Sequence, residues 1–195
     1  MSVSSNQQNL SNGLTRPIGF YNDRLRKAIL LFDHTIDKQF DKVRGRKPAD
    51  LVFYAASEIA DFSVLWHIIN LATLAVRPSK RREAVRLAVA LGAESILVNG
   101  ILKRIFKRER PPLLDERVYD VRRPKTTSFP SGHASSASLA AVLLSASMPK
   151  AKKLWWFLAL VVATSRIHNR MHHPSDVAAG AIGGTAMGLA AKRFR

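Results

Sequence analysis

The sequence predicts an all-α fold, a helical membrane bundle of about five to six spans with an N-terminal amphipathic helix. Three observations lead to this prediction. No segment has the alternating pattern of a substantial strand, apolar runs recur along the chain, and two stretches, 133–148 and 174–191, carry small residues almost all the way round a helix. The candidate spans cover 59–76, 86–102, 133–148, 154–168 and 177–191.

A soluble helical bundle is the competing interpretation. Several runs are shorter than the roughly 20 residues that a perpendicular span requires, and the mean hydropathy of −0.05 is low for a membrane protein. A soluble bundle of this size would, however, show a polar face on every helix. The last run also carries Gly180, Gly184 and Gly188 at four-residue spacing, which predicts the close helix contact common in membranes.

The chain is strongly basic. Its 195 residues fit one domain, and a hydrophobic content of 47% supports a sizeable core, which excludes a wholly disordered chain. The formal net charge of +17 implies an anionic partner: nucleic acid, an anionic membrane surface or a phosphorylated substrate. Because the chain has no cysteine, it has no disulfide, no thiolate metal site and no cysteine nucleophile.

Three regions follow one another along the chain. Residues 1–20 are polar and predict a disordered lead-in. Residues 21–58 predict an amphipathic region, in which a helix from Tyr21 to about Lys47 carries apolar residues at three- and four-residue spacing. This helix is either an ordinary packed surface helix or one that lies at the membrane interface. Residues 59–195 contain the candidate spans and form the predicted core.

The first stretch whose residues could bind or act on a substrate is KRIFKRERP, which begins at Lys103. Lys103 and Arg110 lie seven residues apart, close to two helical turns, so both are expected on one face at a helix end. Two cations in this position can hold a phosphoryl oxygen, the arginine in a bidentate manner. A basic cluster that only touches lipid headgroups explains the same stretch when it is taken alone.

The second stretch is PSGH, from Pro130 to His133. Its proline and glycine lead into a helix whose first-turn N–H groups have no helical partner and are suited to phosphate. Ser131 and Gly132 are therefore candidate main-chain donors, and His133 would stand beside the bound group. A plain helix start with a serine cap is the alternative.

The third stretch is SRIHNRMHHPSD, residues 165–176. His172 and Asp176 are four residues apart, yet Pro174 makes a continuous helix between them doubtful. Asp176 is suited to accept the N–H of one imidazole nitrogen and leave the other as a nucleophile. Metal binding is the rival role, and the neighbouring cations argue against it. The two other histidines, His168 and His173, are interpreted as supporting or structural residues.

Together the three stretches resemble the signature of the type 2 phosphatidic acid phosphatase (PAP2) superfamily. The matching positions are Lys103-x6-Arg110-Pro111, Pro130-Ser131-Gly132-His133 and Ser165-Arg166-x5-His172-x3-Asp176. Each piece is weak by itself, but all positions are present in the family's order and each borders an apolar helix. The resemblance covers about residues 59–191 and leaves the first 50 residues outside it.

This resemblance implies a bacterial membrane lipid phosphatase that needs no metal or other cofactor. His172 would attack phosphorus and form a phosphohistidine, Asp176 would orient it, and His133 would protonate the leaving oxygen. The groups that would bind the phosphoryl oxygens are Lys103, Arg110, Arg166 and the amides of Ser131 and Gly132.

The substrate implied by the resemblance is a phosphomonoester or diphosphate of a lipid. A polyprenyl-linked lipid is favoured, either a polyprenyl diphosphate or a polyprenylphosphoryl sugar phosphate such as decaprenylphosphoryl-5-phosphoribose; phosphatidic acid or phosphatidylglycerol phosphate is the alternative. The other expected partners are the membrane and its anionic lipid headgroups, with no nucleic acid, and a homo-oligomer is compatible with the sequence. A non-catalytic basic protein that binds membranes or nucleic acid, and a soluble phosphatase of the same superfamily, stay open.

The distribution of basic residues predicts an orientation. Five spans place the three motifs on one side of the membrane, as a single site requires. That side would carry 20 of the Lys and Arg residues and the other side 11, or 17 against 11 without the three phosphate-binding cations. By the positive-inside rule, this predicts a multi-pass protein of the cell membrane with its active site on the cytoplasmic side.

Overall fold

The computed structural model describes residues 22–113, 119, 122–124 and 126–194, and all regular secondary structure in that part of the chain is helical. The main helices are α2 (Asp23–Asp41), α3 (Lys47–Ile59), α4 (Val64–Val76), α5 (Arg81–Ser95), α6 (Lys103–Ile105), α7 (Gly132–Ser147), α8 (Lys152–His168) and α9 (Pro174–Arg193). Four further helical elements, η1 (Asp61–Ser63), η2 (Pro78–Lys80), η3 (Ile96–Leu102) and η4 (Pro149–Ala151), join them. The all-α prediction is confirmed. The predicted disordered lead-in, residues 1–20, lies outside the described residues.

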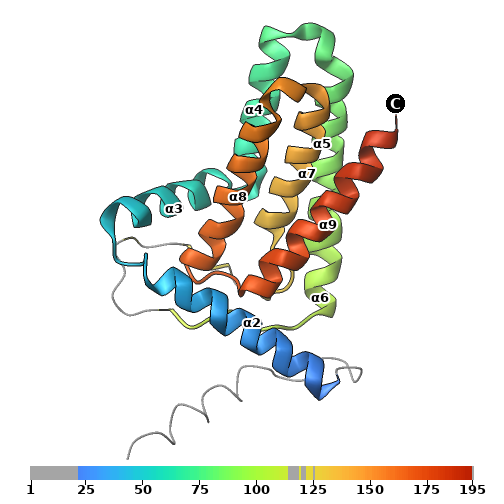
Figure 1. Ribbon diagram of the computed structural model, residues 1–195. Helices are drawn as coiled ribbons and strands as arrows, with labels where there is room; N and C mark the ends of the chain where they lie inside the picture. Colours follow the sequence, from blue (N-terminus) through green and yellow to red (C-terminus); the bar gives the residue numbers. More distant parts are fainter. Residues whose placement is uncertain (1–21, 114–118, 120–121, 125, 195) are drawn as a thin grey trace, which may run out of the picture.

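Five long helices, α4, α5, α7, α8 and α9, run lengthwise as a bundle, and α2 lies across one end of it (Figure 1). At the centre is α7, which packs against α9, α8 and α5. Every residue from Ala134 to Leu144 is buried. Most of these side chains are alanine or serine, so the neighbouring helices approach α7 closely.

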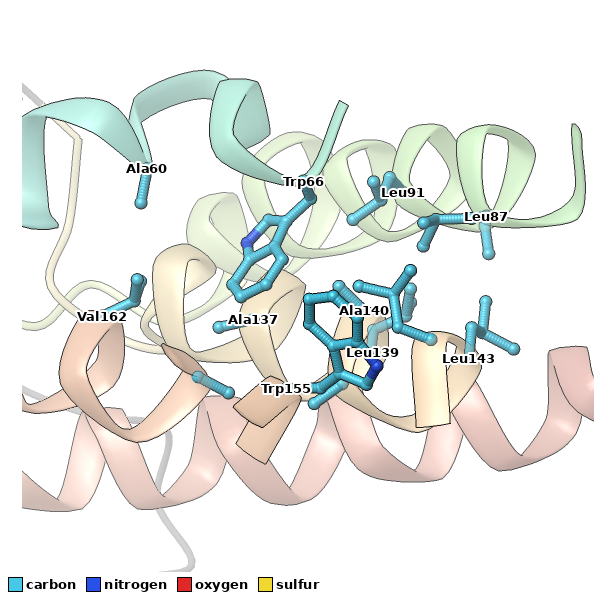
Figure 2. Packing of buried hydrophobic residues seen from close by; sticks show 14 residues of the cluster. Ala60, Trp66, Leu87, Leu91, Ala137, Leu139, Ala140, Leu143, Trp155 and Val162 are labelled. Carbon is cyan, nitrogen blue, oxygen red and sulfur yellow. The ribbon is translucent and has the colours of Figure 1, made fainter. Parts of the chain in front are cut away.

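The apolar core is built mainly by side chains from α4, α5, α7 and α8 (Figure 2). Trp66 of α4 is fully buried, and Leu87 and Leu91 of α5 are each 2% exposed. Leu139 of α7 and Trp155 of α8 complete the centre of the cluster. Large side chains from the outer helices therefore fill the space around a central helix of small residues, and their burial from water stabilises the bundle.

Gly180, Gly184 and Gly188 of α9 lie against α7, as their spacing predicted. A Cβ added at Gly180 would overlap the main chain of Ser131, and one added at Gly184 would overlap that of Ser135. This contact brings the first turn of α9 beside the first turn of α7. The helix starts that carry two of the three motifs are thus held together by a contact that only glycine permits.

The run 59–76 does not form the single straight helix that its composition predicted. Its beginning is the end of α3, and α3 meets α4 at an angle of 60°. Between them, Phe62 and Ser63 have positive φ angles of 52° and 61°, which are uncommon for residues other than glycine. Neither a glycine nor a proline marks this break in the sequence, so the hydropathy pattern could not reveal it.

Among the described residues, one continuous helix, Pro78–Ile105, has the length and apolar composition to cross a membrane. The bent pair formed by α3 and α4 becomes a second candidate if the two helices are taken as one span. The count of about five to six spans therefore stays a prediction.

Gly184→Ala should destabilise the bundle, because α9 cannot make room for a methyl group without moving away from α7. Overpacking of this kind costs about 1–3 kcal/mol, which thermal unfolding of the purified protein would measure. Gly183→Ala is the matched control, because an added Cβ there meets nothing within 4 Å and alanine favours a helix by up to about 1 kcal/mol. Equal unfolding temperatures for the two variants would contradict the proposed contact.

Candidate active site

The three sequence stretches meet at the end of the bundle where α2 lies (Figure 1). The chain reaches this end through the C-terminal ends of α6 and α8, and it leaves through the first turns of α7 and α9. Four helix ends therefore bring the motif residues to one place, although the motifs lie far apart in the sequence.

His172 lies in the turn between α8 and α9 and is 2% exposed; α9 begins only at Pro174, as the proline predicted. Its Nδ1 is 3.8 Å from Oδ2 of Asp176, and its Nε2 is 3.3 Å from Nη1 of Arg110. Burial lowers the pKa of His172 to about 3; Arg110 and Arg166 act in the same direction, and Asp176 opposes them. The imidazole is therefore neutral at physiological pH and keeps a lone pair.

Asp176 is fully buried in the first turn of α9. Its Oδ1 accepts a bond from Arg108 at 2.6 Å, and its Oδ2 accepts bonds from the Ser128 hydroxyl and, at 2.9 Å, from the His173 backbone N–H. Sequence reasoning missed Arg108 and Ser128. The available signal was position, because Arg108 lies inside the first motif and Ser128 lies just before the second.

His133 stands in the first turn of α7, with its side chain 14% exposed. Its Nε2 is 3.6 Å from Oδ1 of Asp61, which comes from the break between α3 and α4. The His133 side chain also interacts electrostatically with Arg166, Lys103 and the ring of His172. The two candidate histidines thus belong to one cluster, together with Asp61, for which the sequence carried no signal.

The three predicted cations also gather here. Arg166 is 3% exposed, and its Nη1 donates to the hydroxyl of Ser57. Arg110 donates through Nη1 to the carbonyl of Met171 at 2.6 Å, and both arginines repel Lys103. Burial lowers the pKa of Arg110 to about 10, so this guanidinium stays charged at neutral pH.

Two buried nitrogen atoms beside the candidate histidines, Nε of Arg166 and Nε2 of His133, have no hydrogen-bond partner within the described part of the chain. Buried polar groups nearly always have a partner. Buried cations also cost free energy unless an anion accompanies them. The cluster therefore has the chemical character of an anion-binding site.

Lys103 and Arg110 do not share a helix face, and the spacing argument was wrong on this point. The helix ends at Ile105, Phe106 is extended (φ −95°, ψ 103°), and Arg110 lies in irregular chain. Proline at position 111 disfavours the helical conformation of Arg110. The two cations approach each other because the chain turns back, not because of helical periodicity.

The role predicted for the Ser131 amide also needs correction. Its N–H donates to the main-chain carbonyl of Asp176 at 3.0 Å, and its side chain caps α7 by accepting a bond from the Ala134 N–H at 3.4 Å. This amide is therefore already engaged. The first-turn donors of α7 that helical geometry leaves unpaired start at Gly132 and include the N–H of His133.

The two remaining histidines of the third stretch have supporting positions, as predicted. His168 is 2.7 Å from Asp50 through its Nε2 and stacks on Phe53. His173 precedes the first turn of α9; its backbone N–H donates to Asp176 at 2.9 Å, and its Nε2 lies 3.2 Å from the carbonyl of Glu109. Within the described residues, no three His, Cys, Asp or Glu side chains are grouped so that they could hold a metal ion.

The fold and the site define a class of protein in which a helical bundle gathers cations, histidines and a buried carboxylate at one end. The chain belongs to the PAP2 superfamily, whose family model matches residues 83–195, and it is a phosphatase. The resemblance inferred from the three motifs is thereby confirmed. The matched residues contain all three motifs.

Relatives with named activities are similar over most of the chain. The decaprenylphosphoryl-5-phosphoribose phosphatase of Mycolicibacterium smegmatis is 34% identical over 129 residues, which cover 65% of this chain and 68% of the relative. The protein of the same name from Mycobacterium tuberculosis is 36% identical over 137 residues, which cover 68% and 72%.

Two solved structures share the fold. Aquifex aeolicus LpxE superimposes with a TM-score of 0.68 at 25% identity, covering 82% of this chain and 94% of that one. The transmembrane PAP2-type phosphatidylglycerolphosphate phosphatase of Bacillus subtilis has a TM-score of 0.64 at 24% identity, covering 86% and 90%. The second similarity shows the fold alone.

Proposed function

We propose that the protein is an integral-membrane lipid phosphatase that hydrolyses a polyprenyl-linked phosphomonoester or diphosphate through a phosphohistidine intermediate. The observation that carries this proposal is the neutral, buried imidazole of His172, held between the guanidinium of Arg110 and the carboxylate of Asp176. A nucleophile, a phosphate-binding cation and an orienting carboxylate are the groups that phosphoryl transfer to histidine requires.

The reaction proceeds in two steps. Asp176 favours the tautomer of His172 with its proton on Nδ1, which leaves the lone pair on Nε2. This lone pair faces Nη1 of Arg110, and it can bond to phosphorus once that guanidinium turns to the phosphoryl oxygens. As this bond forms, the bond from phosphorus to the leaving oxygen breaks, and His133 gives its proton to that oxygen. Water then attacks the phosphohistidine and returns a proton to His133, and the nitrogen–phosphorus bond breaks to release inorganic phosphate.

The cations bind the phosphoryl group and stabilise its charge in the transition state. Arg110 and Arg166 supply guanidinium donors, Lys103 supplies a point charge, and the first-turn amides of Gly132 and His133 contribute main-chain N–H groups. The Ser131 amide is left out of this set because it bonds to Asp176. A bound phosphate dianion would offset the three cations and so favour the protonated form of His133 that a general acid needs.

A lipid substrate is supported by the surface around the site. Large apolar side chains are exposed along the outer faces of the bundle, including Val85 and Val89 on α5, Phe157 and Leu160 on α8, and Ile182 on α9. Exposed apolar surface of this extent is typical of contact with a membrane. The relatives at 34% and 36% identity are named for a polyprenyl-linked sugar phosphate, which favours this substrate class over phosphatidic acid.

The same surface supports a multi-pass arrangement of about five to six spans, with shorter helices crossing a locally thinned bilayer. In this arrangement α2 lies at the membrane interface, where Leu31 and Phe32, 67% and 46% exposed, face the lipid. The excess of basic residues on the motif side supports an active site on the cytoplasmic side.

His172→Ala should reduce phosphate release by about a thousandfold or more, because it removes the covalent nucleophile. The assay uses the purified protein with a panel of a polyprenyl diphosphate, a polyprenylphosphoryl sugar phosphate, phosphatidic acid and phosphatidylglycerol phosphate. His34→Ala, which truncates an exposed histidine on α2, is the matched control and should keep wild-type turnover. Near-normal release by the His172 variant would remove this residue from the nucleophile role, and preference for phosphatidic acid would overturn the polyprenyl assignment.

His133→Ala should slow the enzyme according to the leaving group. For a lipid phosphate, whose alkoxide leaves poorly without a proton, loss of the general acid should cost about 100-fold or more in kcat. For p-nitrophenyl phosphate, whose leaving group needs no proton, the loss should be much smaller. Equal losses on both substrates would show that His133 does not donate that proton.

Cysteine labelling tests the orientation, because the chain has no cysteine of its own. Lys107→Cys and Lys150→Cys replace exposed residues on the motif side and at the opposite end of the bundle. With the site on the cytoplasmic side, an impermeant maleimide added to intact cells should label position 150 and spare position 107, and both should react after permeabilisation. The reverse pattern would contradict the cytoplasmic site.

A further inference from the structure

Arg108 joins two buried carboxylates from distant parts of the chain. Its Nη1 is 2.6 Å from Oδ1 of Asp176, and its Nη2 is 2.6 Å from Oδ2 of Asp33 in the middle of α2. The side chains of Arg108, Asp33 and Asp176 are 12%, 7% and 0% exposed. One guanidinium therefore connects α2 to the carboxylate beside His172.

Asp33 also fastens the start of α9 directly. Its Oδ1 accepts the backbone N–H of Ser175 at 2.7 Å, and its Oδ2 accepts the Ser175 hydroxyl at 2.9 Å. The same hydroxyl accepts a bond from Nη1 of Arg108 at 2.7 Å. A residue of α2 thus acts as a second cap for the helix whose first turn carries Asp176.

The burial of Asp33 is unusual for its helix. Asp33 is the one described residue of α2 that is buried, whereas the apolar Leu31 and Phe32 beside it are exposed. A buried carboxylate costs several kcal/mol unless it is paired. Ordinary packing would place an apolar side chain inward. A buried charge in its place indicates that Asp33 is needed to bind Arg108 and Ser175.

The contacts restrict how Asp176 can turn. Arg108 occupies Oδ1, while Ser128 and the His173 N–H occupy Oδ2, the oxygen that faces Nδ1 of His172. If Asp33 did not hold the other arm of the guanidinium, Arg108 would be free to change its rotamer. The carboxylate would then keep only the two donors on Oδ2, and its orientation toward the histidine would be less restricted.

We infer that Asp33 and Arg108 are positioning residues for the phosphatase reaction, through which α2 holds Asp176 in the orientation that His172 requires. The inference rests on the roles proposed above for His172 and Asp176. It makes α2, which lies outside the residues 83–195 matched by the family model, a working part of the active site.

The test compares Asp33→Asn with Asp37→Asn. Asp37 lies one helical turn further along α2 and pairs with Arg44 at 2.5 Å, so it makes a comparable ion pair that does not contact Asp176. With p-nitrophenyl phosphate as substrate, Asp33→Asn should lower kcat at least tenfold and change KM less than twofold. Asp37→Asn should lower the unfolding temperature by a similar amount and leave kcat unchanged.

A double-variant cycle tests whether the two residues act through each other. Arg108→Gln should lower kcat at least as much as Asp33→Asn, and Asp33→Asn should cost little more in the Arg108→Gln background. Losses that multiply in the double variant, or wild-type kcat in Asp33→Asn, would overturn the inference. If Asp33→Asn does not fold, Arg108→Lys serves instead: its point charge cannot bridge two carboxylates, so undiminished kcat there would also overturn it.

The outcome is separable from that of the proposed substrate class. A wild-type protein that cleaves p-nitrophenyl phosphate but none of the polyprenyl phosphates contradicts the proposed substrate and leaves the Asp33 comparison intact. An active wild type matched by Asp33→Asn contradicts the positioning role alone.

Discussion

The buried carboxylate of Asp176 is the constraint on which the site depends. A charge without solvent must find donors, and here the donors come from three places: Arg108 in the chain after α6, Ser128 before α7, and the His173 N–H at the start of α9. The main-chain carbonyl of Asp176 adds the N–H of Ser131. Satisfying this one residue therefore fixes three segments relative to one another, and it fixes the turn with His172 against the helix start with His133.

Apolar packing makes that polar network possible. The Ser131 N–H reaches the Asp176 carbonyl at 3.0 Å because α9 approaches α7 at backbone distance, and that approach requires glycine at positions 180 and 184. A side chain at either glycine would overlap the backbone of α7 and push the two helices apart. The small side chains in the bundle thus set the distance between α7 and α9, and this distance allows the polar groups at the end of the bundle to form hydrogen bonds.

Sequence reasoning could predict what depends on local pattern. The helical class follows from composition, the glycine contact follows from four-residue spacing, and the motif residues follow from their resemblance to a family signature. It could not predict Asp33 or Asp61, because these carboxylates reach the site only through tertiary packing. Asp33, for example, contacts Ser175, which lies 142 residues away in the sequence. Helical spacing failed for Arg110 because the helix ends at Ile105 and Phe106 is extended, so Arg110 lies beyond the helix.

The arginines of the first motif explain how a strongly basic chain can be selective. Arg108 is neutralised by the carboxylates of Asp33 and Asp176, so its charge is compensated inside the protein. Arg110, two residues later, bonds to main-chain carbonyls, a threonine hydroxyl and the ring of His172, and Arg166 bonds to the hydroxyl of Ser57. These partners satisfy N–H groups without cancelling the charge. We infer that the fold separates arginines that build the site from arginines whose charge remains for a phosphoryl group. In the proposed mechanism this separation, more than the net charge of +17, selects the place where the anion binds.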